Sequence, residues 1–249
     1  MLIAAAVCPH PPLLIPAAMG AAGLADAELR ELRACCADAV AGLLAAGPEL
    51  LVVVGGAADS AVYAGHVAGS LRPFGVPATV GSGRPVLPLS LTVGAWLLEQ
   101  AGRAGQAGSG RPGGVVSCRL QLRAVAADMP TADCLRLGAG LAGLAPRVAL
   151  LAMGDASARR ATGVHGAADP AADRYDSGVA AAFAAADPGA LAALDPALDD
   201  ELKIAGRAAW QVLAGAAAGA SLRGRLRCAV APYDVSYLVA SWESAAAPW

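Results

Sequence analysis

Three short, continuous apolar runs stand out along the chain, at residues 2–7, 50–54 and 147–153. Runs of this length, bounded by turn residues, are typical of strands that are covered on both faces of an α/β sheet. Residues 24–46 lie between the first two runs, carry apolar side chains at helical spacing and end at a Gly-Pro pair. This order predicts a β-α-β unit whose two strands are parallel.

Weaker patterns predict the remaining elements. Residues 115–125 alternate apolar and polar positions, as in a strand with one wetter face, and Thr131 is the expected N-cap of a helix over 131–145. Residues 104–114 are rich in Gly and are expected to form a mobile loop. Strands that alternate with helices indicate one α/β domain over residues 1–249, with a mixed central sheet flanked by helices. Further helices are expected at 89–101, 173–186, 189–194 and 196–218, a short edge strand at 76–80, and closing strands at 226–230 and 235–242.

Polar residues follow each apolar run, where ligands bind in open α/β sheets. Prolines on both sides of His10 hold it in a stiff loop after the first run, and Asp155 and Ser157 follow the third run. The end of the second run, with Asp59, is expected to lie beside the His10 loop. We expect a site at His10, Asp155 and Ser157, although a strand-capping histidine and an Asx turn explain the same residues. Asp199, Asp200 and Glu201 are expected to be helix-start acids rather than catalytic groups.

Charge and cysteine content narrow the classes of function. A formal net charge of -2 without a Lys/Arg cluster leaves no basic field for nucleic acid or a membrane surface. No apolar run reaches the length of a membrane span, and the first residues lack the features of a secretory signal. We expect a cytoplasmic protein with a small-molecule ligand. The six cysteines show no CxxC pair, so we expect reduced thiols, with Cys8 and Cys228 next to the candidate site loops.

Several segments, taken in order, resemble one family over nearly the whole chain. These segments are His10-Pro11-Pro12-Leu13-Leu14, Leu150-Leu151-Ala152-Met153-Gly154-Asp155-Ala156-Ser157, and Ala231-Pro232-Tyr233-Asp234-Val235-Ser236-Tyr237-Leu238-Val239. In this arrangement the chain resembles the class III extradiol ring-cleavage dioxygenases, the LigB-like superfamily that also contains Memo-like proteins. The resemblance implies a LigB-like fold, which is often oligomeric, and therefore allows a homo-oligomer.

The resemblance also implies a non-haem Fe(II) site with two histidines, one carboxylate and an acid/base histidine. His10 matches the first ligand. The other expected positions hold Gly55-Gly56-Ala57 for the second histidine, Ala158 for the acid/base histidine, and Ala229 and Val230 for the carboxylate. An iron site would therefore need substitutes: Asp59 or His66 as metal ligands with His10, His165 as the acid/base group, and Asp155, Cys228 or Asp234 as an anionic ligand.

Two hypotheses of function follow from these residues. The first is an oxidoreductase of the ring-cleaving type that acts on a small molecule, such as an aromatic compound, through an altered site around His10. In it, Asp155 and Ser157 orient His10, and Arg159 or Arg160 holds an anionic group of the substrate. The second is a non-catalytic, metal-free family member that binds a small molecule or a protein partner.

Overall fold

A mixed sheet of seven strands forms the centre of the computed structural model, which describes residues 1–18, 26–65, 67–109, 118–159 and 169–245. The strand order is β3-β7-β2-β8-β1-β10-β9. Strands β7, β2, β8 and β1 are mutually parallel, while β3 and β10 are antiparallel to their neighbours. The strands are β1 (Leu2–Cys8), β2 (Leu50–Ala57), β3 (Ala61–Ala64), β7 (Arg119–Ala126), β8 (Val148–Met153), β9 (Leu222–Val230) and β10 (Tyr237–Ser244).

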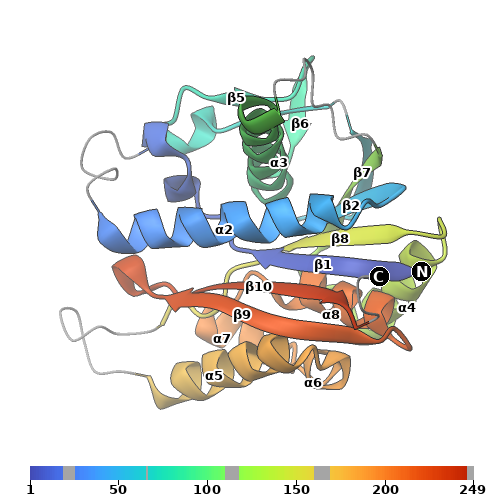
Figure 1. Ribbon diagram of the computed structural model, residues 1–249. Coiled ribbons are helices and arrows are strands. Elements are labelled where there is room, and N and C mark those ends of the chain that lie inside the picture. The colour runs from blue at the N-terminus through green and yellow to red at the C-terminus, as the bar shows by residue number, and fades with distance from the viewer. Residues whose placement is uncertain (19–25, 66, 110–117, 160–168, 246–249) are drawn as a thin grey trace.

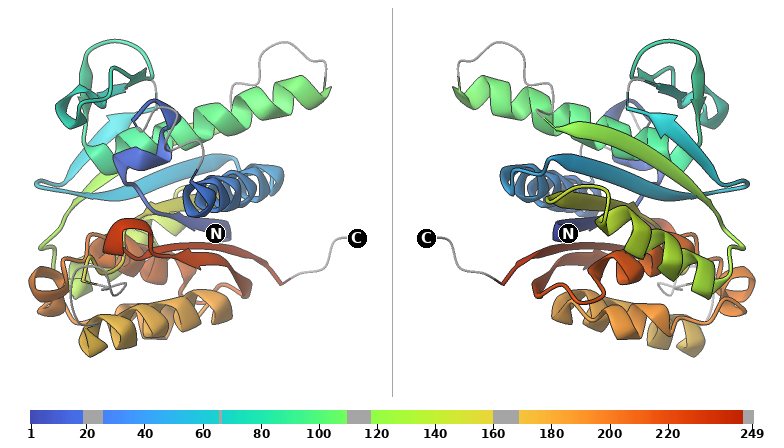
Figure 2. Two further views of the ribbon diagram at one scale, coloured as in Figure 1. Left: turned by 90° about the vertical axis from the view of Figure 1, so that its left-hand side faces the viewer. Right: turned by 90° about the vertical axis from the view of Figure 1, so that its right-hand side faces the viewer.

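Helices cover both faces of this sheet (Figures 1 and 2). Helices α2 (Ala27–Ala45) and α3 (Leu89–Ser109) pack on one face, and a second apolar core lies on the other. A small sheet of β4 (Ala68–Ser70), β5 (Thr79–Val80) and β6 (Pro85–Leu87) lies beside α3. The second face carries α4 (Thr131–Ala142), α5 (Pro170–Ala185), α6 (Pro188–Ala192), α7 (Leu198–Leu202) and α8 (Arg207–Ala217).

The apolar runs are strands, as predicted, because both of their faces meet a helical layer. Every residue of β1 and β8 is buried. The prediction that the ends of the first two strands, β1 and β2, lie side by side was wrong, however. β8 lies between β1 and β2 and pairs in parallel with both. Three equally apolar runs do not encode which of them is central, so the end of β8, rather than that of β2, lies beside the His10 loop.

Several helices differ from those predicted, three of them in ways that have a clear structural cause. The N-cap of α4 is Pro130 without a side-chain cap, so Thr131 is the first helical residue and not the cap. Helix α3 continues to Ser109, so part of the expected 104–114 loop is helical, and residues 110–117 lie outside the described ranges. The single helix expected over 196–218 is two helices, because Lys203 adopts a left-handed conformation (φ 55°).

Helices α4 and α8 pack with their backbones in direct contact. A Cβ added to Gly215 would overlap the carbonyl of Leu135, and one added to Gly138 would overlap the carbonyl of Val212. Small residues therefore set the close approach of these two helices. None of the helices in the described ranges is both long and apolar enough to cross a bilayer.

Candidate functional site

His10 and Asp155 meet at the carboxyl edge of the sheet. The backbone N–H of His10 donates to Asp155 Oδ1 at 2.7 Å, and His10 Nδ1 lies 3.6 Å from the same oxygen. The imidazole is 10% exposed, and Nδ1 has no hydrogen-bond partner among the described residues. Burial raises the pKa of the nearby Tyr237 phenol, and the negative charge of Asp155 raises it further. The predicted pair of His10 and Asp155 is thus brought together, with the imidazole edge facing a carboxylate.

Ser157 is hydrogen-bonded to Asp176 and not to His10. Its hydroxyl donates to Asp176 Oδ2 at 2.6 Å and its backbone N–H donates to Asp176 Oδ1 at 3.0 Å. Both residues are buried, and Asp176 comes from α5. Ser157 therefore ties the strand-end loop to α5, and its hydroxyl is directed to Asp176 rather than to His10.

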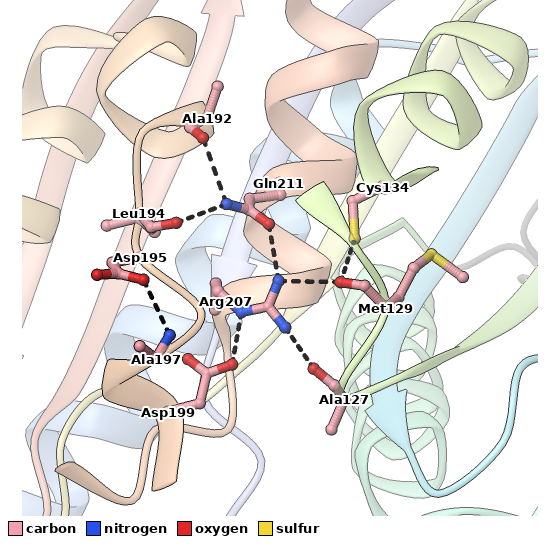
Figure 3. A network of polar contacts seen from close by, with 10 residues as sticks. All are labelled: Ala127, Met129, Cys134, Ala192, Leu194, Asp195, Ala197, Asp199, Arg207 and Gln211. Atoms are coloured by element: carbon pink, nitrogen blue, oxygen red, sulfur yellow. Dashed lines mark hydrogen bonds and ion pairs between the residues drawn. The ribbon is translucent and has the colours of Figure 1, made fainter. Parts of the chain in front are cut away.

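A second polar group, centred on Arg207, lies at the start of α8 (Figure 3). The guanidinium is 1% exposed and donates to the carboxylate of Asp199 at 2.5 Å and to the side-chain oxygen of Gln211 at 2.8 Å. It also donates to the carbonyls of Ala127 and Met129, which follow β7. Arg207 thus joins α7, α8 and the loop after β7 through four hydrogen bonds.

The carboxyl group of Asp199 is held in an unusual environment. Burial raises its pKa above the ordinary 3.8, and this effect outweighs the lowering by the hydrogen bond and charge of Arg207. Its Oδ1 atom is buried and has no hydrogen-bond partner among the described residues. Burial and the charge of Asp199 also raise the pKa of the neighbouring Tyr175 phenol. A carboxyl group with a perturbed pKa beside a cavity is a frequent mark of a functional site.

Asp199 and Arg207 line a cavity of about 280 Å³, which we call the Arg207 cavity. It lies over the ends of β2 and β7, on the α8 side of the sheet. This volume is just below the roughly 300–1,000 Å³ of typical ligand pockets, so it suits a small metabolite. Its wall is formed by Gly56, Ala127, Asp128, Pro196, Asp199, Asp200, Ile204, Ala205, Arg207 and Ala208.

One backbone hydrogen bond joins the cavity wall to the His10 pair. Ala205 lines the Arg207 cavity, and its N–H donates to the carbonyl of Asp155 at 3.1 Å. The carboxylate of the same Asp155 holds the backbone of His10. The two polar groups therefore share the carboxyl edge of the parallel strands, where α/β sheets place ligands.

The structure describes only some of the residues expected to act. Asp59 is exposed at the end of β2, and Arg159 is exposed after β8. His66, Arg160 and His165 lie outside the described residues. Within the described ranges, no three His, Cys, Asp or Glu side chains are placed to hold a metal ion together.

Gly55, the first of the two strand-end glycines of β2, is packed rather than open. A Cβ added to Gly55 would lie 2.5 Å from Ser90 Oγ, and Ser90 is buried at the start of α3. The Ser90 hydroxyl also donates to the carbonyl of Gly56 at 2.8 Å. The space beside Gly55 is therefore filled by α3.

The Asp199–Arg207 pair was missed in the sequence. Asp199 was expected to be a helix-start acid, and it does lie in the first turn of α7. A signal was available in the sequence. Arg207 begins an almost wholly apolar helix, so it is expected to be buried, and a buried arginine requires a partner such as Asp199, eight positions before it.

The chain matches no known protein family and no curated protein. Among solved structures it is similar to "uncharacterized protein JW3007 from Escherichia coli K12", at 14% sequence identity and a TM-score of 0.51. The alignment covers 96% of this chain and 99% of that chain. At this identity the similarity concerns the fold alone, an α/β arrangement with a mixed central sheet flanked by helices.

Proposed function

We propose that this chain is a metal-free relative of the LigB-like extradiol dioxygenases that binds a small ammonium compound in the Arg207 cavity. The resemblance of the His10, Gly154–Ser157 and 231–239 segments supports the family, and the α/β architecture is compatible with it. The observation that carries the ligand is the set of three aspartates, Asp128, Asp199 and Asp200, that line this cavity together.

The donor groups around His10 do not fit the iron site of that superfamily. Asp155 lies near His10, but a third donor is lacking among the described residues. The position expected to hold the second histidine ligand is occupied by Gly55-Gly56-Ala57, where Ser90 fills the space beside Gly55. A single imidazole with one carboxylate falls short of the two histidines and one carboxylate that such iron sites use.

The charges of the Arg207 cavity favour a cation. Three carboxylates line it, from Asp128, Asp199 and Asp200, and Arg207 is the one basic residue among the described residues of the wall. The Arg207 guanidinium has five N–H donors, and four hydrogen bonds to protein groups already engage it. An anion would be repelled by these carboxylates and would find no free guanidinium to bind, whereas an ammonium group would pair with the carboxylates of the cavity wall.

Thermal stability in the presence of n-butylamine, butyrate and n-butanol tests this proposal. A ligand that binds only the folded state raises the melting temperature in proportion to its occupancy. We expect stabilisation by n-butylamine alone, and its loss in Asp199→Asn. Ala208→Leu, which fills the cavity from α8 without a change of charge, should abolish it too. Asp133→Asn removes an acid outside the cavity and should keep it.

Two results would contradict the proposal. Stabilisation by butyrate, or an unchanged response of both cavity variants, would rule out an ammonium ligand at Asp199. Near-stoichiometric iron in protein reconstituted anaerobically with Fe(II) would show that the chain is not metal-free.

The His10–Asp155 pair supports a second candidate function, general base catalysis without a metal. A carboxylate beside Nδ1 favours the tautomer that carries its proton there, which leaves the Nε2 lone pair free to accept a proton from a substrate. Nitrogen-15 NMR of His10 reports this tautomer directly. We expect protonation at Nδ1 in the native protein and a shift toward Nε2 in Asp155→Ala. An Nε2-protonated ring in the native protein would remove this candidate.

A further inference from the structure

Four of the six cysteines gather between helix α2 and the sheet. Cys8 ends β1, Cys35 and Cys36 are adjacent on α2, and Cys228 lies on β9. The thiols of Cys36 and Cys8 lie close enough for one to shift the pKa of the other, as do those of Cys228 and Cys35. The chain therefore brings together two thiol pairs that its sequence spacing does not reveal.

A β-bulge directs Cys228 toward the helix. Cys228 pairs with Val239, while Leu226 pairs with Ala240, so Arg227 is the extra residue of β9. Bulges re-aim side chains at sheet edges, and β9 is the edge strand here. The carbonyl of Arg227 accepts a hydrogen bond from the Cys35 thiol at 3.7 Å. Cys35 therefore lies next to two residues of the bulge, Arg227 and Cys228.

The four thiols differ in access to solvent. Cys8 and Cys36 are fully buried, and Cys228 is 7% exposed. Cys35 is half-buried, which makes it the one member of the cluster that a dissolved reagent can reach. Burial raises the pKa of the Cys228 thiol, and the neighbouring Cys8 thiol and burial raise that of Cys36. These two thiols keep their protons and are poor nucleophiles toward a dissolved disulfide, so reaction must begin at Cys35.

We propose that Cys35 and Cys228 form a redox-active pair that low-molecular-weight disulfides, such as oxidised glutathione, convert to an intramolecular disulfide. The Cys35 thiolate attacks one sulfur of the reagent, whose S–S bond breaks and releases one thiol. The Cys228 thiol, which lies next to Cys35, then attacks Cys35 Sγ, its proton passes to the departing thiolate, and the second reagent thiol is released. The two protein thiols give up two electrons and two protons, and one reagent disulfide becomes two thiols.

The crosslink would fix the helix that holds the His10 loop. Two residues before Cys35, Arg33 donates from Nε to the carbonyl of Leu14 and from Nη2 to that of Leu13, both at 2.8 Å. Leu13 and Leu14 form the turn η1 (Pro12–Leu14), which follows His10. A bond from Cys35 to β9 therefore restrains the helix through which Arg33 positions this turn. The inference is independent of the ligand proposed for the Arg207 cavity.

Oxidised glutathione, added to the folded full chain and followed by alkylation of the denatured protein and intact-mass analysis, tests the pair. We expect oxidised protein to carry two fewer alkylated thiols than the six cysteines of the reduced protein. Peptide mapping should recover a crosslink between Cys35 and Cys228. Cys134→Ser, a change on α4 outside the cluster, should behave as the native chain does.

Variants of Cys228 and Cys35 separate the formation of the glutathione adduct from the formation of the crosslink. Cys228→Ser should stop at a glutathione adduct on Cys35, whereas Cys35→Ser should give neither adduct nor crosslink. Circular dichroism establishes that each variant is folded, and Cys228→Ala replaces Cys228→Ser if the serine variant is not. Failure of the native chain to lose thiols, or a mapped bond between Cys8 and Cys36, would overturn the proposal.

Discussion

Asp155 Oδ1 accepts the backbone N–H of His10 at 2.7 Å, although the two residues are 145 positions apart in the chain. The bond joins the loop after the first strand to the loop after β8. Because both loops leave neighbouring parallel strands, one carboxylate fixes the conformation of the other loop. This relationship holds whichever function the edge serves.

Loss of this acceptor should destabilise the fold. Asp155→Ala leaves a buried N–H without a partner, at a cost of about 1–3 kcal/mol in the free energy of unfolding. Asp155→Asn keeps an acceptor oxygen and should cost clearly less. Urea unfolding of the two variants measures the difference. Equal losses would show that the charge, and not the hydrogen bond, matters.

Arg207 and Arg136 make a matched pair of arginines, each bonded to an aspartate. The side chain of Arg207 is 1% exposed, whereas that of Arg136 is 74% exposed. Arg207→Ala leaves Asp199 partly buried and uncompensated, so we expect a loss of about 3–5 kcal/mol in unfolding free energy. Arg136→Ala should change it by less than about 1 kcal/mol. Similar losses in both variants would contradict the role of Arg207 as a buried hub.

The Asp199 carboxyl makes stability depend on pH in a defined direction. Its folded pKa lies above the unfolded value of 3.8, so the folded state holds this proton more tightly. The resulting contribution to stability is complete below pH 3.8 and is lost as the pH rises through the folded pKa. Relative to Asp199→Asn, the native chain should therefore lose stability over this range. Chemical unfolding at a series of pH values measures the difference, and an opposite slope would contradict the raised pKa.

The contact of Gly55 with Ser90 can be tested by a double-mutant cycle. Gly55→Ala should destabilise the chain because its methyl group overlaps the serine side chain. In a Ser90→Gly background the same change should cost less, with a coupling energy of about 1–3 kcal/mol. Additive effects would mean that α3 shifts freely and that space beside Gly55 is available.

Two glycines test the contact between α4 and α8. Gly215→Ala forces a methyl group against the Leu135 carbonyl and should cost about 1–3 kcal/mol. Gly140→Ala, on α4, has no atom within 4 Å of the added Cβ and should stabilise the helix by roughly 0.5–1 kcal/mol. Thermal unfolding compares the two directly. A stabilised Gly215→Ala would contradict the backbone contact.

The central strands and most helices could be predicted because their patterns follow from burial. Residues 2–7 and 148–153 are apolar since helices cover both faces of β1 and β8. The order of the strands in the sheet could not be predicted from burial, because each of the three apolar runs would fit any central position of the sheet. The position of β8 follows from long-range pairing that no local pattern records.

One of the two polar groups of the candidate site, the Asp199–Arg207 pair, likewise could not be predicted from a local sequence pattern. His10 and Asp155 could be predicted because both follow apolar runs and strand ends converge at one edge. Asp199 resembled an ordinary first-turn acid, and its difference lies in Arg207, which packs against it from the next helix. The four-cysteine cluster is set by the bulge at Arg227, whose position depends on pairing with β10.

The place of β8 also governs how the chain can fold as it is synthesised. β1 leaves the ribosome well before its two partners, β8 and β10. β2 and β7 can pair with each other earlier, but β1, which is wholly apolar, stays unpaired until β8 has been made. Such exposed strands favour aggregation of nascent chains. Fragments that end before β8 should therefore depend on chaperones, whereas fragments that include β8 can close the centre of the sheet.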